Sequence, residues 1–209
     1  MQASATDADF RQLRHQTKNA LQRILLLIEE HPALQQDESA QTLAADLQRR
    51  ITLVAAISDA LFGFTQCPEH FVQRLRALCE GLVMLLGSAE QAIRVGVLVA
   101  GRCPSPLEEI VLRVAHEFVG NAVKHGMYAR NGGRIDVRLD CDGHQTRLTV
   151  TDDGWGYVDQ PAAGEGLSLA SLIAAEQDGT VTLSRRGSRT QATLLLPYAS
   201  REGADRTTS

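Results

Sequence analysis

The sequence has few aromatic residues, no long apolar run and no excess of one charge sign. Phe, Tyr and Trp make up 4% of the 209 residues, so a core must be built mainly of aliphatic side chains. No apolar stretch approaches the roughly 18–20 residues that span a bilayer, and the polar, acidic N-terminus is not a secretory signal. The net charge of −4 gives no reason to expect nucleic acid or membrane partners. We therefore expect a cytoplasmic protein.

Cysteine is also scarce and is not arranged for metal binding. The four cysteines, Cys67, Cys79, Cys103 and Cys141, form no CxxC pair and have no histidine cluster beside them. We interpret them as reduced structural thiols. With 44% hydrophobic and 22% charged residues, the chain has the composition of a globular protein, apart from a polar tail at 200–209 that we expect to be disordered.

Two amphipathic stretches open the chain. Residues 8–30 contain no Gly or Pro, and residues 38–64 repeat apolar side chains every three or four positions, which predicts two helices joined by the connection 31–37. Asp7 or Asp9 is placed to cap the first helix. The first helix has an apolar stripe of Phe10, Leu13, Thr17, Leu21, Ile24 and Ile28 and a polar stripe of His15, Lys18, Asn19 and Gln22. An antiparallel hairpin cannot cover its own apolar faces, so we expect two copies to pair into a four-helix bundle as a homodimer.

Helical and strand patterns mix from residue 69 onward. Predicted helices cover 69–86, 106–125 and 166–177, and predicted strands cover 92–99, 133–140, 146–152, 179–185 and 190–196. Ser105 is expected to cap the second of these helices, with Pro106 at its first position and Glu108 completing a capping box. Asp142-Gly143 is typical of a hairpin turn. This order predicts an α+β fold, with one mixed sheet covered by helices on one face.

The segment HEFVGNAVKHG at 116–126 carries a first polar constellation. Glu117, Asn121 and Lys124 are spaced at i, i+4 and i+7, so they share one face of a helix. An amide oxygen suits Mg²⁺, a carboxylate can orient a metal-bound water, and a lysine can bind phosphate. A solvated polar helix face would show the same pattern.

Two glycine-containing segments follow. DDGWGY at 152–157 comes directly after a predicted strand, where a carboxylate can accept a hydrogen bond from an amine such as that of adenine and glycines allow a ligand to approach the backbone. GEGLSLA at 164–170 opens a helix, whose first N–H groups favour phosphate. Taken singly, each is equally compatible with an ordinary turn or helix start.

The three segments together, in this order, resemble the N, G1 and G2 boxes of the Bergerat-fold ATP-binding domain of histidine kinases and gyrase-type ATPases. The resemblance implies that ATP and Mg²⁺ bind here, with Asn121 holding the metal, Asp152 reading the adenine amine and Glu117 polarising the metal or attacking group. It places Lys124 and His125 near the phosphates. The further nucleotide-binding positions that it implies are Gly154, Gly156, Gly164, Gly166, Leu167 and Thr190. The lid between the G1 and G2 boxes, 157–163, is short.

The N-terminal segment RHQTKNALQRILLLI at 14–28 resembles the phosphoacceptor helix of the HWE-type and closely related histidine kinases. His15, Lys18, Asn19 and Gln22 match that pattern, and His116 followed by Glu117 resembles the N box of the same group. The resemblance implies that His15 accepts the phosphoryl group. It also implies that Asn19 lies where related kinases orient a water for dephosphorylation.

These observations predict a two-component histidine kinase core, that is, a protein-histidine phosphotransferase. Residues 1–64 would form the dimerisation and phosphoacceptor hairpin, and residues 65–199 would form the ATP-binding domain. ATP would phosphorylate His15, and an Asp of a response-regulator receiver domain would then take the phosphoryl group, with input from a possible separate sensor protein. Two alternatives stay open: a histidine phosphotransfer protein of the same architecture with weak or no ATP binding, and an ATP-binding switch module of the anti-sigma or serine-kinase type.

Overall fold

The structure is a computed structural model, and it describes residues 3–63, 70–88, 90–155, 165–187 and 189–198. The chain divides into two compact units, Met1–His70 and Phe71–Ser209. Each unit is described by itself below.

The first unit is a helical hairpin. α1 spans Ala3–Glu30 and α2 spans Glu38–Phe62, and the short 3-10 helix η1, Pro32–Gln35, lies between them. α2 begins at an Asp37 cap, whose carboxylate accepts a hydrogen bond of 2.8 Å from the Ala40 amide. It ends at Gly63, which adopts the left-handed conformation that favours glycine. α1 begins at Ala3, so the prediction that Asp7 or Asp9 caps it is wrong.

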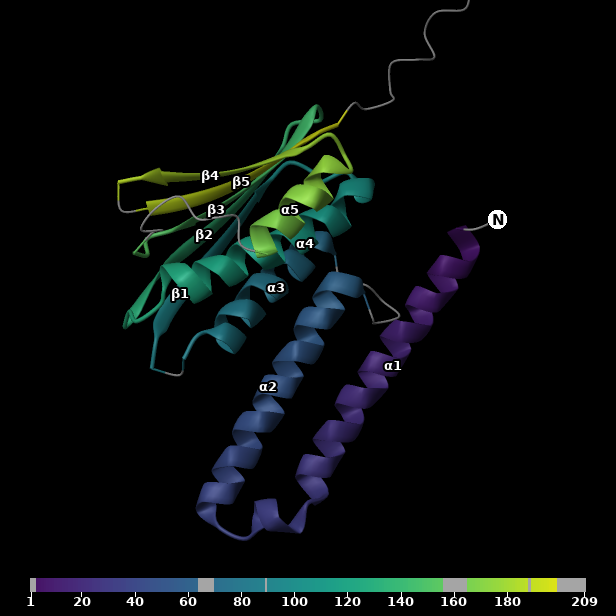
Figure 1. Cartoon of the computed structure of the whole chain (residues 1–209), viewed down its shortest axis with the longest axis vertical. Coiled ribbons are helices and arrows are strands. Elements are labelled where there is room, and N and C mark those ends of the chain that lie inside the picture. The colour runs from purple at the N-terminus through teal and green to yellow at the C-terminus, as the bar shows by residue number, and fades with distance from the viewer. Residues whose placement is uncertain (1–2, 64–69, 89, 156–164, 188, 199–209) are drawn as a thin grey trace, which may run out of the picture. The chain divides into compact units, whose positions relative to one another are not determined.

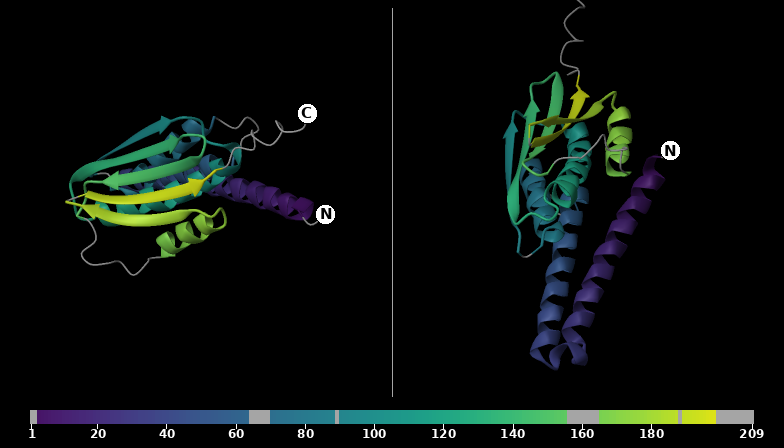
Figure 2. Two further views of the ribbon diagram at one scale, coloured as in Figure 1. Left: turned by 90° about the horizontal axis from the view of Figure 1, so that it is seen from above. Right: turned by 60° about the vertical axis from the view of Figure 1, so that its left-hand side comes forward.

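The two helices of the hairpin leave a groove and apolar side chains uncovered. α1 and α2 diverge from the connection toward the N-terminal end of α1 (Figures 1 and 2). Between them lies a cavity of about 380 Å³, lined from α1 by Lys18, Leu21, Gln22 and Leu25 and from α2 by Thr52, Ala55, Ala56 and Asp59. Large apolar side chains are exposed along both helices at Ile24, Leu26, Leu27, Leu43, Leu47 and Val54.

The second unit is a five-stranded sheet with helices α3, α4 and α5 on one face (Figure 1). The helices are α3 Phe71–Leu86, α4 Ser105–Asn121 and α5 Glu165–Ala175, and the strands are β1 Ala92–Ala100, β2 Gly132–Cys141, β3 Gln145–Asp152, β4 Thr180–Arg186 and β5 Arg189–Pro197. The strand order is β1-β2-β3-β5-β4, and only the β1–β2 pair is parallel. The predicted α+β fold with a mixed sheet is therefore confirmed.

The core lies between the sheet and these helices. Alternate residues of each strand point to the same face, and the helix-covered face carries the buried ones. They include Ile135, Val137, Leu139, Leu148, Val150, Leu194 and Leu196, and Val111 and Phe118 of α4 are buried as well. This aliphatic layer holds the ends of β2, β3 and β5 in register, and so it fixes the backbone on which the polar residues described below are placed.

Two details of α4 differ from the sequence prediction. Pro104 is the N-cap and makes no side-chain cap hydrogen bond, so Ser105 is the first helical residue and the predicted serine cap is wrong. At its other end, α4 passes into a π-helical turn, η2, over Ala122–Gly126, which a hydrogen bond from the Met127 amide to the Ala122 carbonyl closes. The α-helix predicted over 106–125 therefore ends at Asn121, and the turn that continues it is wider than an α-helical turn.

The described cysteines are free thiols: Cys79, Cys103 and Cys141. Burial raises the pKa of Cys79 to about 12, so this thiol stays protonated and unreactive at neutral pH. Cys67 lies outside the described residues. Within the described part of the chain, no helix is both long and apolar enough to span a membrane.

Candidate functional site

Asp152 is the buried carboxylate at the end of β3. It is 6% exposed and lies in the sheet between Ile135 of β2 and Thr190 of β5. Its Oδ1 accepts a hydrogen bond of 2.9 Å from the Gly154 amide. Burial raises the pKa of Asp152, and the Gly154 amide opposes this only in part. The fold thus holds a carboxylate where it is costly to ionise, which is typical of a functional position.

Glycines bring the neighbouring backbone against this carboxylate. A Cβ on Gly126 would lie 2.6 Å from Asp152 Oδ1, and a Cβ on Gly154 would lie 2.2 Å from the Gly126 carbonyl oxygen. The Trp155 amide donates to the same carbonyl at 3.1 Å. The end of η2 and the loop after β3 are therefore in direct backbone contact, and a side chain at either glycine would force them apart.

Thr190 supplies an unpaired polar group beside Asp152. It is 5% exposed, and its hydroxyl is buried without a hydrogen-bond partner among the described residues. A buried hydroxyl without a partner is costly unless a ligand or a water meets it. A carboxylate and a hydroxyl side by side suit a planar heterocycle that offers an amino donor and a ring acceptor. Of the predicted adenine-binding residues, the structure thus brings Asp152 and Thr190 together.

The polar face of α4 follows the prediction from Glu117 to Asn121, in the last turn of the α-helix. Glu117 and Asn121 are partly buried and four residues apart within the α-helix. The His116 Nδ1 and Glu117 Oε1 atoms are 3.1 Å apart. Lys124 and His125 are exposed, and both lie in the π-helical turn η2. The expected α-helical spacing from Glu117 to Lys124 is therefore wrong, because the α-helix ends at Asn121.

The third glycine segment is described only in part. α5 begins at Glu165, so Gly166 lies in its first turn, and Leu167 is half-buried. Gly156, Gly164 and the lid 157–163 lie outside the described residues.

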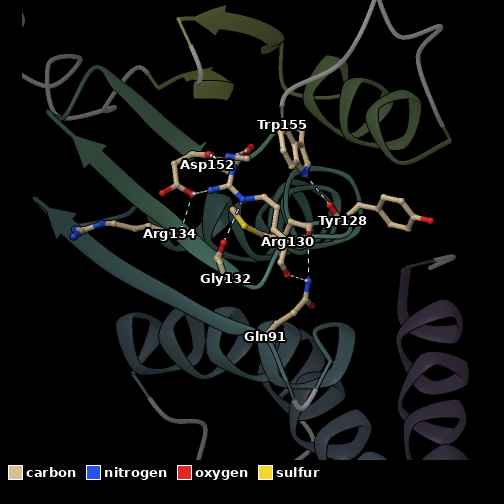
Figure 3. A network of polar contacts seen from close by, with 10 residues as sticks. Gln91, Tyr128, Arg130, Gly132, Arg134, Asp152 and Trp155 are labelled. Atoms are coloured by element: carbon tan, nitrogen blue, oxygen red, sulfur yellow. Dashed lines mark hydrogen bonds and ion pairs between the residues drawn. The ribbon is translucent and has the colours of Figure 1, made fainter.

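A second polar network, which no sequence motif predicted, lies beside Asp152 (Figure 3). Arg130 lies at its centre, with Trp155 on one side and Gln91 on the other. The guanidinium of Arg130 donates to the Asp153 carbonyl at 2.7 Å and to the Gly132 carbonyl at 3.2 Å. These contacts join residues that are far apart in the chain, so motif spacing cannot reveal them.

In the hairpin unit, His15 and Asn19 are both exposed on α1, as are Lys18 and Gln22. An exposed imidazole is accessible to a reaction partner. Their exposure agrees with the predicted polar stripe.

Replacing Gly154 by alanine is expected to destabilise the second unit by about 1–3 kcal/mol, because its Cβ would overlap the Gly126 carbonyl. Gly120 provides the matched control: it lies inside α4, and a Cβ there would have its nearest neighbour, in Leu86, at 3.8 Å. Gly120→Ala should instead stabilise the protein by roughly 0.5–1 kcal/mol. Urea unfolding of both variants measures the difference, and equal stabilities would contradict it.

Comparisons with known proteins identify the fold around this site. Residues 107–200 match the family described as histidine kinase-, DNA gyrase B- and HSP90-like ATPase. The sensor histidine kinase PdtaS of Mycolicibacterium smegmatis is 25% identical over 187 residues, which cover 84% of this chain and 36% of that protein. Blue-light-activated histidine kinase 1 of Erythrobacter litoralis is 23% identical over 194 residues, which cover 77% of this chain and 54% of that protein. The chain thus spans between about a third and a half of these relatives.

Solved structures agree on the architecture. The histidine kinase domain of the Erythrobacter litoralis EL346 blue-light activated histidine kinase superposes with a TM-score of 0.56 at 20% identity, covering 86% of this chain and 95% of that one. Full-length ShkA in complex with AMPPNP gives a TM-score of 0.51 at 18% identity, covering 95% of this chain and 46% of that one. At these identities the likeness shows the fold alone. With the family match over 107–200, it shows that this part of the chain has the fold of that ATPase family.

Proposed function

We propose that the protein is a two-component histidine kinase that phosphorylates its own His15 from ATP and passes the phosphoryl group to an Asp of a response-regulator receiver domain. The observation that carries the proposal is the buried Asp152 beside the Thr190 hydroxyl, which has no hydrogen-bond partner among the described residues; the two groups suit the edge of a purine. The exposed His15 on the N-terminal hairpin supplies the acceptor.

The transfer step requires a nucleophile, a leaving group and positioning. A neutral nitrogen of His15 forms a bond to the γ-phosphorus of ATP, the bond from that phosphorus to the bridging oxygen breaks, and ADP leaves. The His15 ring then loses its N–H proton to solvent or to a nearby base. Glu117 is the carboxylate on α4 that we assign to polarising the reacting groups, with His116 3.1 Å from it.

The residues of α4 and η2 have the chemistry to hold a metal–phosphate group. The amide oxygen of Asn121 is suited to Mg²⁺, which supplies charge stabilisation to the transferring phosphoryl group when it is bound. Lys124 and His125 are exposed on the adjoining turn, where we assign them to the phosphates. Gly154 and Gly166 are assigned to the walls of the pocket, with Leu167 beside them and Asn19 orienting a water in the reverse, dephosphorylating reaction.

The hairpin favours a homodimer. Its groove of about 380 Å³ and its exposed leucines and isoleucines leave apolar surface that a second hairpin would bury in a four-helix bundle. We assign residues 1–64 to this dimerising and phosphoacceptor part and residues 65–199 to ATP binding. A separate sensor protein would supply the input.

Labelling with γ-phosphate-labelled ATP and Mg²⁺ tests the proposal. Wild type should become labelled, and the label should be lost in acid and kept in base, as expected for phosphohistidine. Asn121→Ala should reduce the labelling at least tenfold because the metal–phosphate group loses its ligand. An acid-stable label would instead indicate a serine-kinase-type switch. Absence of both label and ATP binding by calorimetry would indicate a histidine phosphotransfer protein.

A further inference from the structure

The side chain of Gln91 holds the turn that follows η2. Its Nε2 donates to the carbonyls of Met127 and Arg130, each at 2.8 Å, and its Oε1 accepts from the Ser88 amide at 3.0 Å. Between those two carbonyls lies Ala129, whose φ of 53° places a non-glycine residue in the left-handed region. Such a conformation persists only where surrounding contacts maintain it. The single amide of Gln91 supplies these contacts from a segment more than 35 residues earlier in the chain.

Arg130 connects this turn to the loop after β3. Besides its bonds to the Asp153 and Gly132 carbonyls, its guanidinium lies 5.6 Å from the centre of the Trp155 ring. The Trp155 indole N–H in turn donates to the Tyr128 carbonyl at 3.0 Å. The turn at 127–130 and the loop at 152–155 are thus joined in both directions, by Arg130 from the turn and by Trp155 from the loop (Figure 3).

The contacts of Arg130 and Trp155 lie next to the buried carboxylate of the candidate site. Asp153, whose carbonyl Arg130 binds, directly follows the buried Asp152. The contacts lie on either side of the Gly126–Gly154 approach, where the backbone has no room to adjust. A shift of the 152–155 loop would therefore move the Asp152 carboxylate relative to Thr190.

We propose that Arg130 is a positioning residue for nucleotide selection, which fixes the Asp152 carboxylate at the place where it meets the amino group of the purine. This inference rests on the proposed binding of ATP. Gln91 acts one step further away, because it holds the backbone from which the Arg130 side chain extends. The planar guanidinium is needed, since a lysine cannot donate to two carbonyls while stacking on an indole.

Calorimetric titration with two nucleotides tests the inference. One is ATP, and the other is purine riboside triphosphate, which lacks the 6-amino group. Wild type should prefer ATP. Arg130→Met should bind ATP about tenfold more weakly and leave the affinity for the purine riboside analogue within about twofold, so that the preference collapses. Arg138→Met is the matched control: the exposed Arg138 lies on β2, where it pairs with the half-buried Asp140, and the variant should retain the wild-type preference.

A second substitution separates positioning from loss of fold. Gln91→Glu is isosteric and keeps Arg130, but it replaces the amide donor by a carboxylate that faces the Met127 and Arg130 carbonyls. It should reduce the preference in the same direction, with a circular-dichroism spectrum like that of wild type.

Three results would overturn the inference. Equal losses of affinity for both nucleotides in Arg130→Met would make the contacts merely structural, and so would an affinity for both that stays at the wild-type value. A wild type that binds both nucleotides alike would overturn the assignment of Asp152 as the adenine-reading group and this inference with it. An unchanged preference in Arg130→Met alone would leave the proposed function standing.

Discussion

Replacing His15 by glutamine is expected to reduce labelling from ATP to background. Glutamine keeps a polar side chain of good helix propensity, but its amide nitrogen is not a nucleophile toward phosphorus. His15 is exposed on α1, so the loss of the ring should leave the stability of the hairpin almost unchanged. Acid-labile label on the wild type and variant proteins, measured at equal concentrations, gives the result.

His31→Gln provides the control for this loss. His31 is the other exposed histidine of the hairpin, at the N-cap of η1. The His31→Gln variant should keep full labelling. Both variants should bind ATP as tightly as wild type, because neither substitution lies in the second unit. Retention of the label by His15→Gln would assign the acceptor to another residue and remove the basis for a histidine kinase that acts on this helix.

Hydrophobic periodicity predicted the architecture because burial controls it. The alternation in 146–152 is imposed by a sheet face that meets a core. Local chemistry likewise predicted the Asp142-Gly143 turn, where Gly143 has a φ of 89°. Wherever one face of an element is buried, the pattern of the sequence carries the information directly.

The failures occur where several local solutions compete. Ser105 and Pro104 are both able to begin a helix, and the helix begins one residue earlier than the serine cap would require. The π-helical turn η2 contains one residue more than an α-helical turn, and the hydrophobic periodicity of so short a segment cannot reveal the extra residue. Its result is that Gly126 meets Asp152, a contact between residues that no local rule connects.

The candidate site likewise contains some residues that were predicted from the sequence and others that were not. Asp152 was predicted from its place at a strand end, and the structure adds that Thr190 lies beside it with a hydroxyl that meets no partner in the described part of the chain. Arg130 and Gln91 were not predicted, because a side chain that binds a distant carbonyl has no required spacing. The side chains that we assign to ligand binding therefore appeared as motifs, whereas the side chains that contact the backbone around them appeared only in the folded chain.

Replacing Asp152 by asparagine is expected to weaken ATP binding while stabilising the protein without ligand. The amide keeps an oxygen for the Gly154 N–H, but the charge that would strengthen the proposed bond to the adenine amine is lost. Hydrogen bonds to charged groups contribute roughly 1.5–3 kcal/mol, so affinity should fall roughly 10- to 100-fold. Calorimetric titration measures the affinity, and scanning calorimetry measures the unfolding temperature.

The stability change has a sign that pH can test. Burial raises the pKa of Asp152 above its unfolded value, so its favourable contribution to folding is present below about pH 4 and is lost as the pH rises through the raised pKa. Burying this carboxyl therefore costs stability at pH 7, and asparagine removes that cost. The variant should unfold at a higher temperature than wild type at pH 7, and the difference should shrink as the pH approaches 4.

Asp142→Asn should show the opposite sign and serves as the control. Backbone amides of His144 and Gln145 lower the pKa of Asp142, so its ionised form contributes stability above the unfolded pKa and loses it as the pH falls. This variant should unfold at a slightly lower temperature at pH 7 and bind ATP normally. If Asp152→Asn also lowered the unfolding temperature, the carboxylate would be a structural group. Opposite signs at the two aspartates would mean that the fold bears the cost of a buried charge at Asp152 because the ligand uses it.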